Sequence, residues 1–516
     1  MKKTCRSIMV QGTGSSVGKS LMVTALCRIF REEGFRVAPF KPQNMSLNSF
    51  VTATGCEVSR AQAVQAEAAG VELTADMNPI LLKPLRDKGS QVIVHGRVYG
   101  VMDAKSFQSF KKVARGFVLE SFRRLSEEHD IIVIEGAGSP AEINLREEDI
   151  ANMGTAHMTD SPVILVGDID RGGVFASIVG TLELLSAEDR DRIKGFVINK
   201  FRGDLSLLTS GLKMLEERTG LPVLGVVPFL EGVYIQEEDG VNIKERIREG
   251  NTVDIAVIQL PHISNFTDFE PFLHDEDVTL RYVKHGTPVG RADILIIPGT
   301  KNTIEDLRYL KRAGYLKEIQ AHVERGGMLI GICGGFQMLG RLIEDPYGVE
   351  EGGTEEGLGY LPVETRLEPE KLTQRVEASL QTGNIVKDNL KITGYEIHAG
   401  TSRKVDDSLP SPFLIYRRGG KDVNIEDGCS TEDGRIWGTY IHGLFDNTGL
   451  RRALIERVKM EKGLPTGEFH SSTEYSAKRE EGYRRLAEWV RKSLKMDIIY
   501  QMMGLDTSTR RIGAGR

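Results

Sequence analysis

The N-terminal stretch MVQGTGSSVGKS, residues 9–20, contains the residue types that bind a phosphate chain. An apolar run precedes it and a helical pattern follows it, so the loop would present backbone N–H groups and a positive helix end to phosphate oxygens. Lys19 can reach the terminal phosphates, and the Ser20 hydroxyl can bind a magnesium ion. The predicted phosphate contacts are Gly12, Thr13, Gly14, Ser15, Val17, Gly18, Lys19 and Ser20. The alternative is a glycine-rich turn without a ligand.

A second stretch, GICGGFQMLG at residues 331–340, places Cys333 between glycines where an apolar run meets a helical pattern. The arrangement G-x-C-x-G is typical of a nucleophile elbow, which exposes a thiol at a sheet edge beside N–H groups that can stabilise an oxyanion. A lone buried cysteine is usually an inert core residue. The flanking glycines favour a nucleophile here.

The spacing of the N-terminal loop departs from the usual phosphate-binding motif G-x-x-x-x-G-K-[ST]. Counting back from Gly18, the usual glycine position holds Thr13, and the glycine stands one residue earlier at Gly12. This lengthened loop resembles that of the dethiobiotin synthetase group of ATP-dependent carboxylate enzymes. The related partition ATPases carry an additional lysine at the place of Gly14, so its absence argues against a positioning ATPase.

An acidic residue follows a later apolar run, DIIVIEGAGSP, and supports the same resemblance. Glu135 would lie at the carboxyl end of a strand, where it can hold magnesium beside the phosphates. The resemblance implies this role for Glu135 and makes Ser20 its partner as a metal ligand. It also implies that Asn199 and Lys200, at the end of another predicted strand, lie near the adenine.

The cysteine stretch resembles the class I glutamine amidotransferases, in which a thiolate attacks the glutamine amide and releases ammonia. Gln337 meets the C-x-x-x-Q spacing of that family, and Gly299 in IIPGTKNT matches its oxyanion-side loop. The resemblance assigns the base to His442 in TYIHGLF, 109 residues after Cys333. His398 in GYEIHAG is a rival, more consistent with a structural or substrate-side residue.

The third member of the usual glutaminase triad is missing from its expected place. Most of these glutaminases have the sequence H-P-E at this point, whereas here His442 is followed by Gly443 and Leu444. Either a cysteine–histidine dyad operates, or an acid comes from elsewhere in the chain.

Short apolar runs alternate with helical patterns along most of the chain, which predicts an α/β fold with two mostly parallel sheets flanked by helices. The charged stretch at 237–252 interrupts this pattern. The predicted organisation is an ATP-dependent synthetase domain at 1–245 and a glutaminase domain at 252–449. Helices at 450–503 are expected to attach to the second domain, and the polar tail 504–516 is expected to be disordered.

Composition excludes several other classes of protein. The 516 residues carry a net charge of −6 with interspersed signs, which indicates neither a nucleic-acid surface nor a polybasic membrane patch. The five cysteines are widely spaced and form no C-x-x-C pair, so no zinc or disulfide framework is expected. No apolar run reaches 18 residues, and the N-terminal run is too short for a signal peptide. We expect a cytoplasmic protein, and homo-oligomer formation is compatible with the sequence.

Three further polar clusters follow predicted strands in the first half, at 41–49, 146–154 and 167–177. Each brings acids, amides or glycines to the carboxyl edge of a sheet, where α/β proteins bind ligands. Any one of them could simply be a solvated loop. Together they predict a broad polar surface for a substrate, with Asp168 and Asp170 as loose candidates for catalysis or magnesium binding.

The two predicted sites combine into one reaction, an ATP- and glutamine-dependent amidation of a carboxylate. Two families join such halves in this order, the CTP synthases and the corrinoid amidases, and the absence of H-P-E favours the second. The stretches that carry this resemblance are FKPQNMSLNS, GCEVSRAQAVQAEA, MNPILLKP, NMG, VGDIDRGGVFAS, NKFRGD, GYEIHAG and YIHGLF. The resemblance covers nearly the whole chain to about residue 490, and the tail lies outside it.

The resemblance to corrinoid amidases implies ATP, Mg²⁺, glutamine and a corrinoid as the small-molecule partners. MNPILLKP favours the branch that amidates carboxylates b, d, e and g of adenosylcobyrinic acid a,c-diamide over the branch that amidates a and c. Asp149 in REEDIANMG matches a family acid near the activated carboxylate, so the resemblance predicts that it acts in catalysis or binds magnesium. The rival hypotheses are an ATP switch with a regulatory glutaminase-like domain, a CTP synthase, and a corrinoid-binding protein without chemistry.

Overall fold

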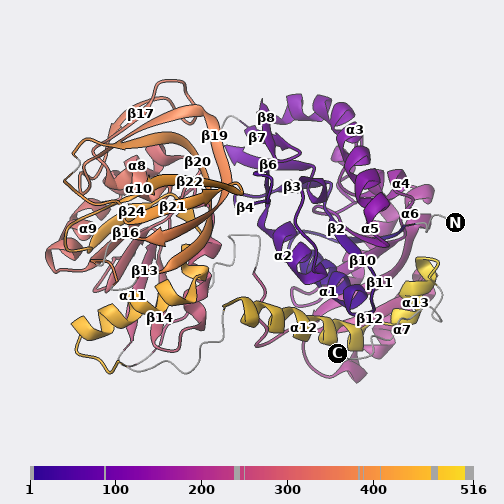
Figure 1. The fold of residues 1–516 in the computed structure, drawn as a ribbon. Coiled ribbons are helices and arrows are strands. Elements are labelled where there is room, and N and C mark those ends of the chain that lie inside the picture. Colours follow the sequence, from indigo (N-terminus) through magenta and orange to yellow (C-terminus); the bar gives the residue numbers. More distant parts are fainter. Residues whose placement is uncertain are drawn as a thin grey trace. The chain divides into compact units, whose positions relative to one another are not determined.

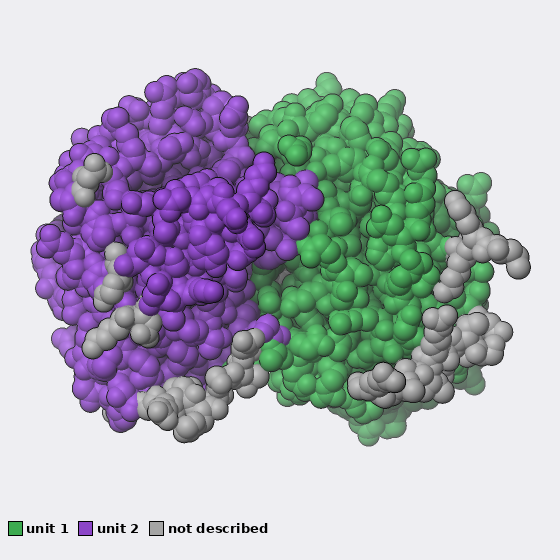
Figure 2. Space-filling model, viewed as in Figure 1, with its two compact units in different colours: residues 1–46, 58–236, 477–516 green, residues 47–57, 237–476 purple. Residues whose placement is uncertain are grey.

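A computed structural model describes residues 5–85, 89–236, 245–248, 250, 252–381, 384–386, 389–406, 408–466 and 475–505. The chain forms two compact units, which are coloured separately in Figure 2. The first takes residues 1–46, 58–236 and 477–516, and the second takes residues 47–57 and 237–476. No helix in the described ranges is long and apolar enough to cross a membrane.

The first unit is built on a six-stranded parallel sheet with the order β12-β11-β10-β1-β9-β2. Strands β2, β10, β11 and β12 of this sheet are labelled in Figure 1. Its strands are β1 (Arg6–Gly12), β2 (Val37–Phe40), β9 (Ile131–Glu135), β10 (Val163–Asp168), β11 (Ile193–Phe201) and β12 (Val223–Pro228). The strands are almost continuous apolar runs because helices cover both faces of such a sheet. Since β9 and β10 flank β1, the loops that follow these three strands meet at one edge.

A smaller, mostly antiparallel sheet and a set of helices complete the first unit. The sheet has the order β3-β6-β7-β8, with β3 (Gln43–Met45), β6 (Ile80–Leu85), β7 (Gly89–Val94) and β8 (Arg97–Met102). The helices are α1 (Lys19–Glu32), α2 (Arg60–Ala69), η1 (Ala75–Met77), α3 (Ala104–Glu128), η2 (Ile143–Leu145), α4 (Met153–Met158), α5 (Val174–Leu184), α6 (Ala187–Arg192), η3 (Leu205–Leu207) and α7 (Thr209–Thr219).

The C-terminal helices differ from the sequence-based prediction. Helix α11 (Thr448–Glu461) lies in the second unit as expected, but α13 (Met496–Met502) and nearly all of α12 (Tyr475–Ser493) belong to the first. Tyr483 and Tyr500 are buried in the same hydrophobic core as α1. Attachment of all of 450–503 to the second domain is therefore wrong, because these helices bury their apolar faces in the first unit. Of the predicted disordered tail, residues 506–516 lie outside the described residues.

The second unit contains a six-stranded sheet, of which five strands run parallel, with the order β14-β13-β15-β16-β24-β23. Its strands are β13 (Val253–Ile258), β14 (Val278–Val283), β15 (Ile294–Ile297), β16 (Met328–Ile332), β23 (Cys429–Ser430) and β24 (Ile436–Thr439). Its helices besides α11 are η5 (Phe266–His274), α8 (Thr303–Arg312), α9 (Tyr315–Glu324), α10 (Gly334–Leu339) and η6 (Leu444–Asp446). The predicted fold class, two helix-flanked and mostly parallel sheets, is confirmed.

A second, mostly antiparallel sheet in the same unit was not predicted. Its path is β18-β17-β19-β20-β25, and β21 and β22 extend it from β19. The strands are β17 (Leu342–Asp345), β18 (Gly353–Glu356), β19 (Val363–Leu380), β20 (Lys391–Lys404), β21 (Phe413–Arg418), β22 (Lys421–Asp427) and β25 (Ile441–His442). Strand β25 brings His442 opposite Tyr395 of β20.

A short piece of the N-terminal sequence also belongs to the second unit. Residues 47–57 contain β4 (Ser49–Val51) and the start of β5 (Glu57–Ser59), and they lie between β3 and α2 along the chain. The predicted assignment of the whole range 1–245 to one domain therefore misses this excursion.

Candidate functional site

The glycine-rich loop joins β1 to α1, as the sequence predicts. Gly18 adopts a left-handed conformation with φ 101°, and a Cβ there would stand 2.1 Å from Nδ2 of Asn199. A Cβ at Gly12 would stand 2.5 Å from the Val17 side chain. Both positions therefore require glycine. Lys19 turns back across the loop, where its Nζ donates to the carbonyl oxygens of Gly14 (2.8 Å) and Gly138 (3.0 Å).

Glu135, at the carboxyl end of β9, lies beside the start of α1 and is 1% exposed. Its Oε1 accepts hydrogen bonds from Ser20 Oγ and Lys41 Nζ, each at 2.8 Å, and its Oε2 accepts one from Gln65. Burial alone raises the pKa of Glu135, but Lys41, Ser20 and Gln65 outweigh it and lower the pKa. The group is thus held as a carboxylate. Lys41 and Gln65 had not been singled out from the sequence.

The Ser20 hydroxyl and the Glu135 carboxylate fit the donor set that magnesium requires. Mg²⁺ binds hard oxygen ligands and usually keeps several waters, so one carboxylate and one hydroxyl beside a phosphate chain suffice. The described residues contain no cluster of three or more His, Cys, Asp or Glu side chains that could hold a metal by themselves. A site completed by phosphate oxygens is the kind that these two residues could form.

Asn199 and Lys200 lie beside the loop because β11 pairs with β10 in the parallel sheet. Asn199 Nδ2 donates to the carbonyl of Val17 (2.8 Å), and Lys200 Nζ donates to Ser16 (2.6 Å) and to the Asp168 carboxylate (2.8 Å). In this structure these three side chains brace the loop. Asp170 is instead more exposed and pairs with Arg202 at 3.1 Å.

Asp149 is engaged with its own backbone. Its carboxylate accepts N–H bonds from Ala151 (2.8 Å), Asn152 (3.1 Å) and Gly154 (2.9 Å), which shapes the turn before α4. Asn152 in turn donates to the carbonyl of Ala137, in the loop after Glu135, at 2.6 Å. Asn152 therefore links this turn to the loop that follows Glu135, while the Asp149 carboxylate holds the backbone of the turn in place.

Cys333 occupies the sharp turn between β16 and α10. Its backbone is strained, with φ 51° and ψ −109°, as expected for a nucleophile elbow. Close packing requires a glycine two residues later, since a Cβ at Gly335 would stand 1.9 Å from the carbonyl oxygen of Ile297. The thiol lies near the carbonyl of Ile397 on β20, to which it donates at 3.8 Å.

The side chains of Cys333, His442 and Asp268 have the arrangement of a catalytic triad, with His442 between the other two. His442 Nδ1 donates to Asp268 Oδ2 at 2.6 Å, and the Gly443 N–H donates to the other carboxylate oxygen at 3.1 Å. Burial alone lowers the pKa of His442, but Asp268 and Cys333 outweigh it and raise the pKa to about 10. Because Asp268 fixes the proton on Nδ1, Nε2 is the nitrogen left for Cys333.

The acid of the triad thus comes from η5, 174 residues before His442. The geometry favours an acid from elsewhere in the chain over a cysteine–histidine dyad, because the buried Asp268 carboxylate binds the imidazole nitrogen that faces away from Cys333. In the sequence, the only signal was an aspartate in the stretch SNFTDFEPF, close after the first strand of the domain. Spacing from Cys333 could not have identified it.

The remaining predicted glutaminase residues surround this triad. A Cβ at Gly299 would stand 3.1 Å from Cε1 of His442, so the loop after β15 passes beside the imidazole. Gln337 donates to Tyr440 Oη at 3.1 Å and accepts from Thr303 Oγ1 at 3.2 Å. His398 stacks on Tyr440 with ring centroids 3.8 Å apart and donates to the Gly400 carbonyl. Of the two candidate histidines, His442 is therefore the one that contacts Cys333.

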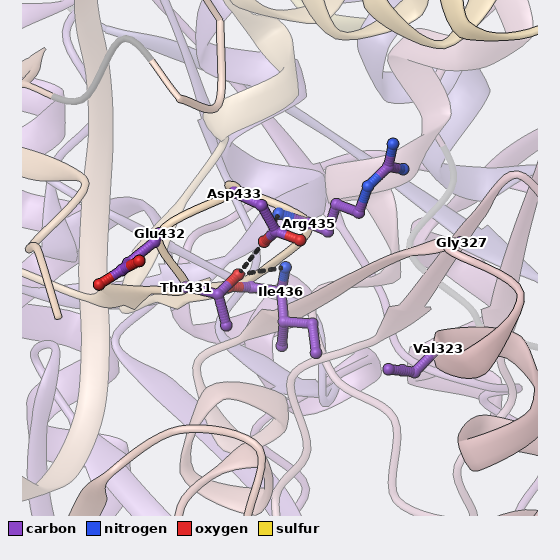
Figure 3. A pocket seen from close by; sticks show the side chains of 7 residues that line it. All are labelled: Val323, Gly327, Thr431, Glu432, Asp433, Arg435 and Ile436. Carbon is purple, nitrogen blue, oxygen red and sulfur yellow. Dashed lines mark hydrogen bonds between the residues drawn. The ribbon is translucent and has the colours of Figure 1, made fainter.

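A separate cavity of about 400 Å³ lies away from these residues (Figure 3). It is lined by Val323, Gly327, Thr431, Glu432, Asp433, Arg435 and Ile436. Ile436 begins β24, whereas Thr439 at its other end pairs with Ile332, next to Cys333. The cavity is therefore at the opposite sheet edge and contains no predicted site residue.

Family models match both the nucleotide-binding half and the glutaminase half of the chain. Residues 8–243 match the family described as the CobQ/CobB/MinD/ParA nucleotide binding domain, and residues 254–450 match the CobB/CobQ-like glutamine amidotransferase domain. A nucleotide-binding half and a glutaminase half with a cysteine triad define the class of glutamine-dependent amidoligases that use ATP.

The full-length relatives narrow this class. The chain is 51% identical to the cobyric acid synthase of Thermoanaerobacter sp. (strain X514), covering 96% of this chain and 98% of the relative. It is 51% identical to that of Caldanaerobacter subterraneus, with the same coverages, and 49% identical to that of Clostridium acetobutylicum, covering 97% and 99%. The chain belongs to the cobyric acid synthase family, and it is a ligase of cobalamin biosynthesis.

Replacing Asp268 by asparagine should lower glutamine hydrolysis by about 10²- to 10⁴-fold, the range that positioned acid–base groups contribute. Without the carboxylate, burial acts with less opposition, so the pKa of His442 falls and the alkaline limb of kcat/KM moves to lower pH. Glutamate release measured across pH tests this. Glu276→Gln, at an exposed site just after η5, is the matched control. Wild-type activity and pH profile in Asp268→Asn would remove Asp268 from the triad.

Proposed function

We propose that this enzyme amidates carboxylates b, d, e and g of adenosylcobyrinic acid a,c-diamide, using one ATP and one glutamine for each. The observation that carries the proposal is the occurrence in one chain of a cysteine–histidine–aspartate triad and a phosphate loop beside a buried carboxylate. The membership in the cobyric acid synthase family supports the choice of substrate.

In the glutaminase half, the Cys333 thiolate attacks the amide carbon of glutamine, and His442 holds the proton that the leaving ammonia takes up. The raised pKa of His442 favours the imidazolium needed for this step. We expect backbone N–H groups around Gly299 and Gly334 to stabilise the oxyanion. Water then attacks the thioester, with His442 accepting its proton, and glutamate leaves. In this proposal Gln337, which Thr303 and Tyr440 hold in place, helps to bind glutamine.

In the synthetase half, a corrinoid carboxylate oxygen attacks the terminal phosphorus of ATP, ADP leaves, and an acyl phosphate forms. Lys19 and the loop N–H groups bind the phosphate oxygens as charge moves toward ADP. Ser20 and Glu135 would hold magnesium, which supplies further charge neutralisation when bound. Ammonia then attacks the acyl carbon, phosphate leaves, and the amide remains.

The other predicted residues take supporting roles in this proposal. Asn199 and Lys200 hold the phosphate loop beside the nucleotide base, with Asp168 as the partner of Lys200. Asp149 shapes the turn next to the acyl-phosphate position, and Asp170 lies among the exposed loops that the corrinoid would meet.

The acyl phosphate can be tested by trapping. With ATP, Mg²⁺, the corrinoid diamide and hydroxylamine, but no glutamine, a corrinoid hydroxamate should form together with ADP and phosphate. Hydroxylamine attacks the acyl carbon in place of ammonia and displaces phosphate. Mass spectrometry detects the product, and omission of ATP is the control. ADP formation without any ATP-dependent hydroxamate would contradict the intermediate.

A further inference from the structure

The segment 47–57 packs against the glutaminase residues, although it belongs to the N-terminal sequence that otherwise forms the ATP-binding unit. Strand β4 is its central part. The carbonyl oxygen of Ser49 accepts hydrogen bonds from Asn265 Nδ2 (3.2 Å) and from Tyr395 Oη (3.4 Å), while Asn265 also donates to Tyr395 Oη at 2.9 Å. A buried three-way contact therefore joins β4 to two residues of the glutaminase.

Apolar contacts reinforce this polar one. The Phe50 ring meets the Tyr395 ring edge-on, with centroids 4.9 Å apart, and Val51 is buried with Tyr395 in one small hydrophobic cluster. Further along, Glu57 forms an ion pair with Lys371 of β19 at 2.6 Å. Because its contacts are both buried and directional, this segment can fix the position of Tyr395.

Tyr395 and Asn265 each touch one member of the catalytic triad. The Tyr395 ring stacks on the His442 ring at a centroid distance of 5.4 Å and an interplanar angle of 18°. Asn265 stands at the start of η5 with φ 52°, and its carbonyl accepts the N–H of Asp268 at 2.9 Å. One face of the imidazole and the backbone of its acidic partner are thus both set by residues that bind Ser49.

We propose that Tyr395 is a positioning residue for His442, and that residues 49–51 hold Tyr395 and Asn265 in place for the glutaminase reaction. Neither Tyr395 nor β4 acts on the substrate. They restrict rotation of the imidazole, so that Nε2 faces Cys333 while Nδ1 stays bonded to Asp268. The N-terminal sequence is therefore part of the glutaminase machinery.

The test compares glutamine hydrolysis with amidation driven by added ammonium salt. Tyr395→Leu removes the ring from His442 and should lower kcat for glutamate release about 10- to 100-fold, with little change in KM, the scale expected when a catalytic group is misplaced. Tyr395→Phe keeps the stacked ring and should recover most of that loss. Phe50→Ala, at a position in the N-terminal sequence, should lower kcat about three- to tenfold for the same reason.

Ammonium-driven amidation separates this effect from damage to the ATP site, since Lys41 and Gln65, which flank the segment in the chain, both bind Glu135. It should stay at the wild-type rate in all three variants. Tyr416→Leu, on β21, is the matched control and should leave both rates unchanged. Wild-type kcat in Tyr395→Leu and Phe50→Ala, or equal losses in both assays, would overturn the proposal. Glutamine hydrolysis that survives Cys333→Ala would contradict the glutaminase assignment instead.

Discussion

The Cys333→Ala variant is expected to lose glutamine-driven amidation while it keeps amidation driven by ammonium salt. Without the thiol no thioester can form, and the loss should be roughly 10⁴-fold or more, as for removal of the nucleophile from other triads. The ATP-binding unit contains the phosphate loop and Glu135 and does not use this thiol. Parallel assays of amide formation with glutamine and with ammonium salt measure the two activities separately.

A matched variant guards against a loss caused by unfolding. Cys429→Ala makes the same change at another buried cysteine of the same unit, on β23, and should retain both activities. If Cys333→Ala lost both activities while remaining folded, Cys333 would be a structural residue. If it kept glutamine-driven activity, the nucleophile would be elsewhere.

The Lys19→Ala variant is expected to lose amidation with either nitrogen source. Lys19 is the cation of the phosphate loop, and its ammonium lies across the loop between Gly14 and Gly138. Removing one preorganised donor to developing charge costs roughly 10²–10³-fold in rate, so amide formation should fall by at least about that factor. Rates of ADP and amide formation at saturating ammonium salt measure the effect.

Lys213→Ala, at an exposed position on α7, is the control for the loss of one positive charge from this unit. Glutaminase activity assayed without ATP should persist in Lys19→Ala, because the triad lies in the other unit. Wild-type amidation in Lys19→Ala would remove Lys19 from the ATP site.

The sequence was most informative where a motif is local. The loop from Gly12 to Ser20 and the turn at Cys333 each lie between a strand and a helix, as their glycine spacing predicts. Glu135 followed from the same logic, because the carboxyl ends of parallel strands share one edge. Its partner Lys41 also follows a strand of that sheet, but one lysine among several polar residues gave no reason to choose it.

Features that depend on distant contacts were not predictable in the same way. Asp268 meets His442 only because η5 and β25 come together in the folded unit. Strand β19 alternates buried and less buried residues only at its two ends, and its charged, partly exposed middle interrupts the pattern that would identify a single long strand. Helix α12 follows the glutaminase in sequence but packs on the first unit, and chain order alone pointed to the wrong neighbour.

The central claim is that this chain converts four carboxylates of one corrinoid into amides. Mass spectrometry of the corrinoid after incubation with ATP, Mg²⁺ and glutamine tests it most directly. With adenosylcobyrinic acid a,c-diamide as the substrate, we expect four successive decreases of about one mass unit, because each step converts a carboxylic acid to an amide. If the diamide stayed unchanged, the central claim would be contradicted. If a second incubation with cobyrinic acid then gave amidation only at positions a and c, the activity would be that of the sister enzyme, cobyrinic acid a,c-diamide synthase.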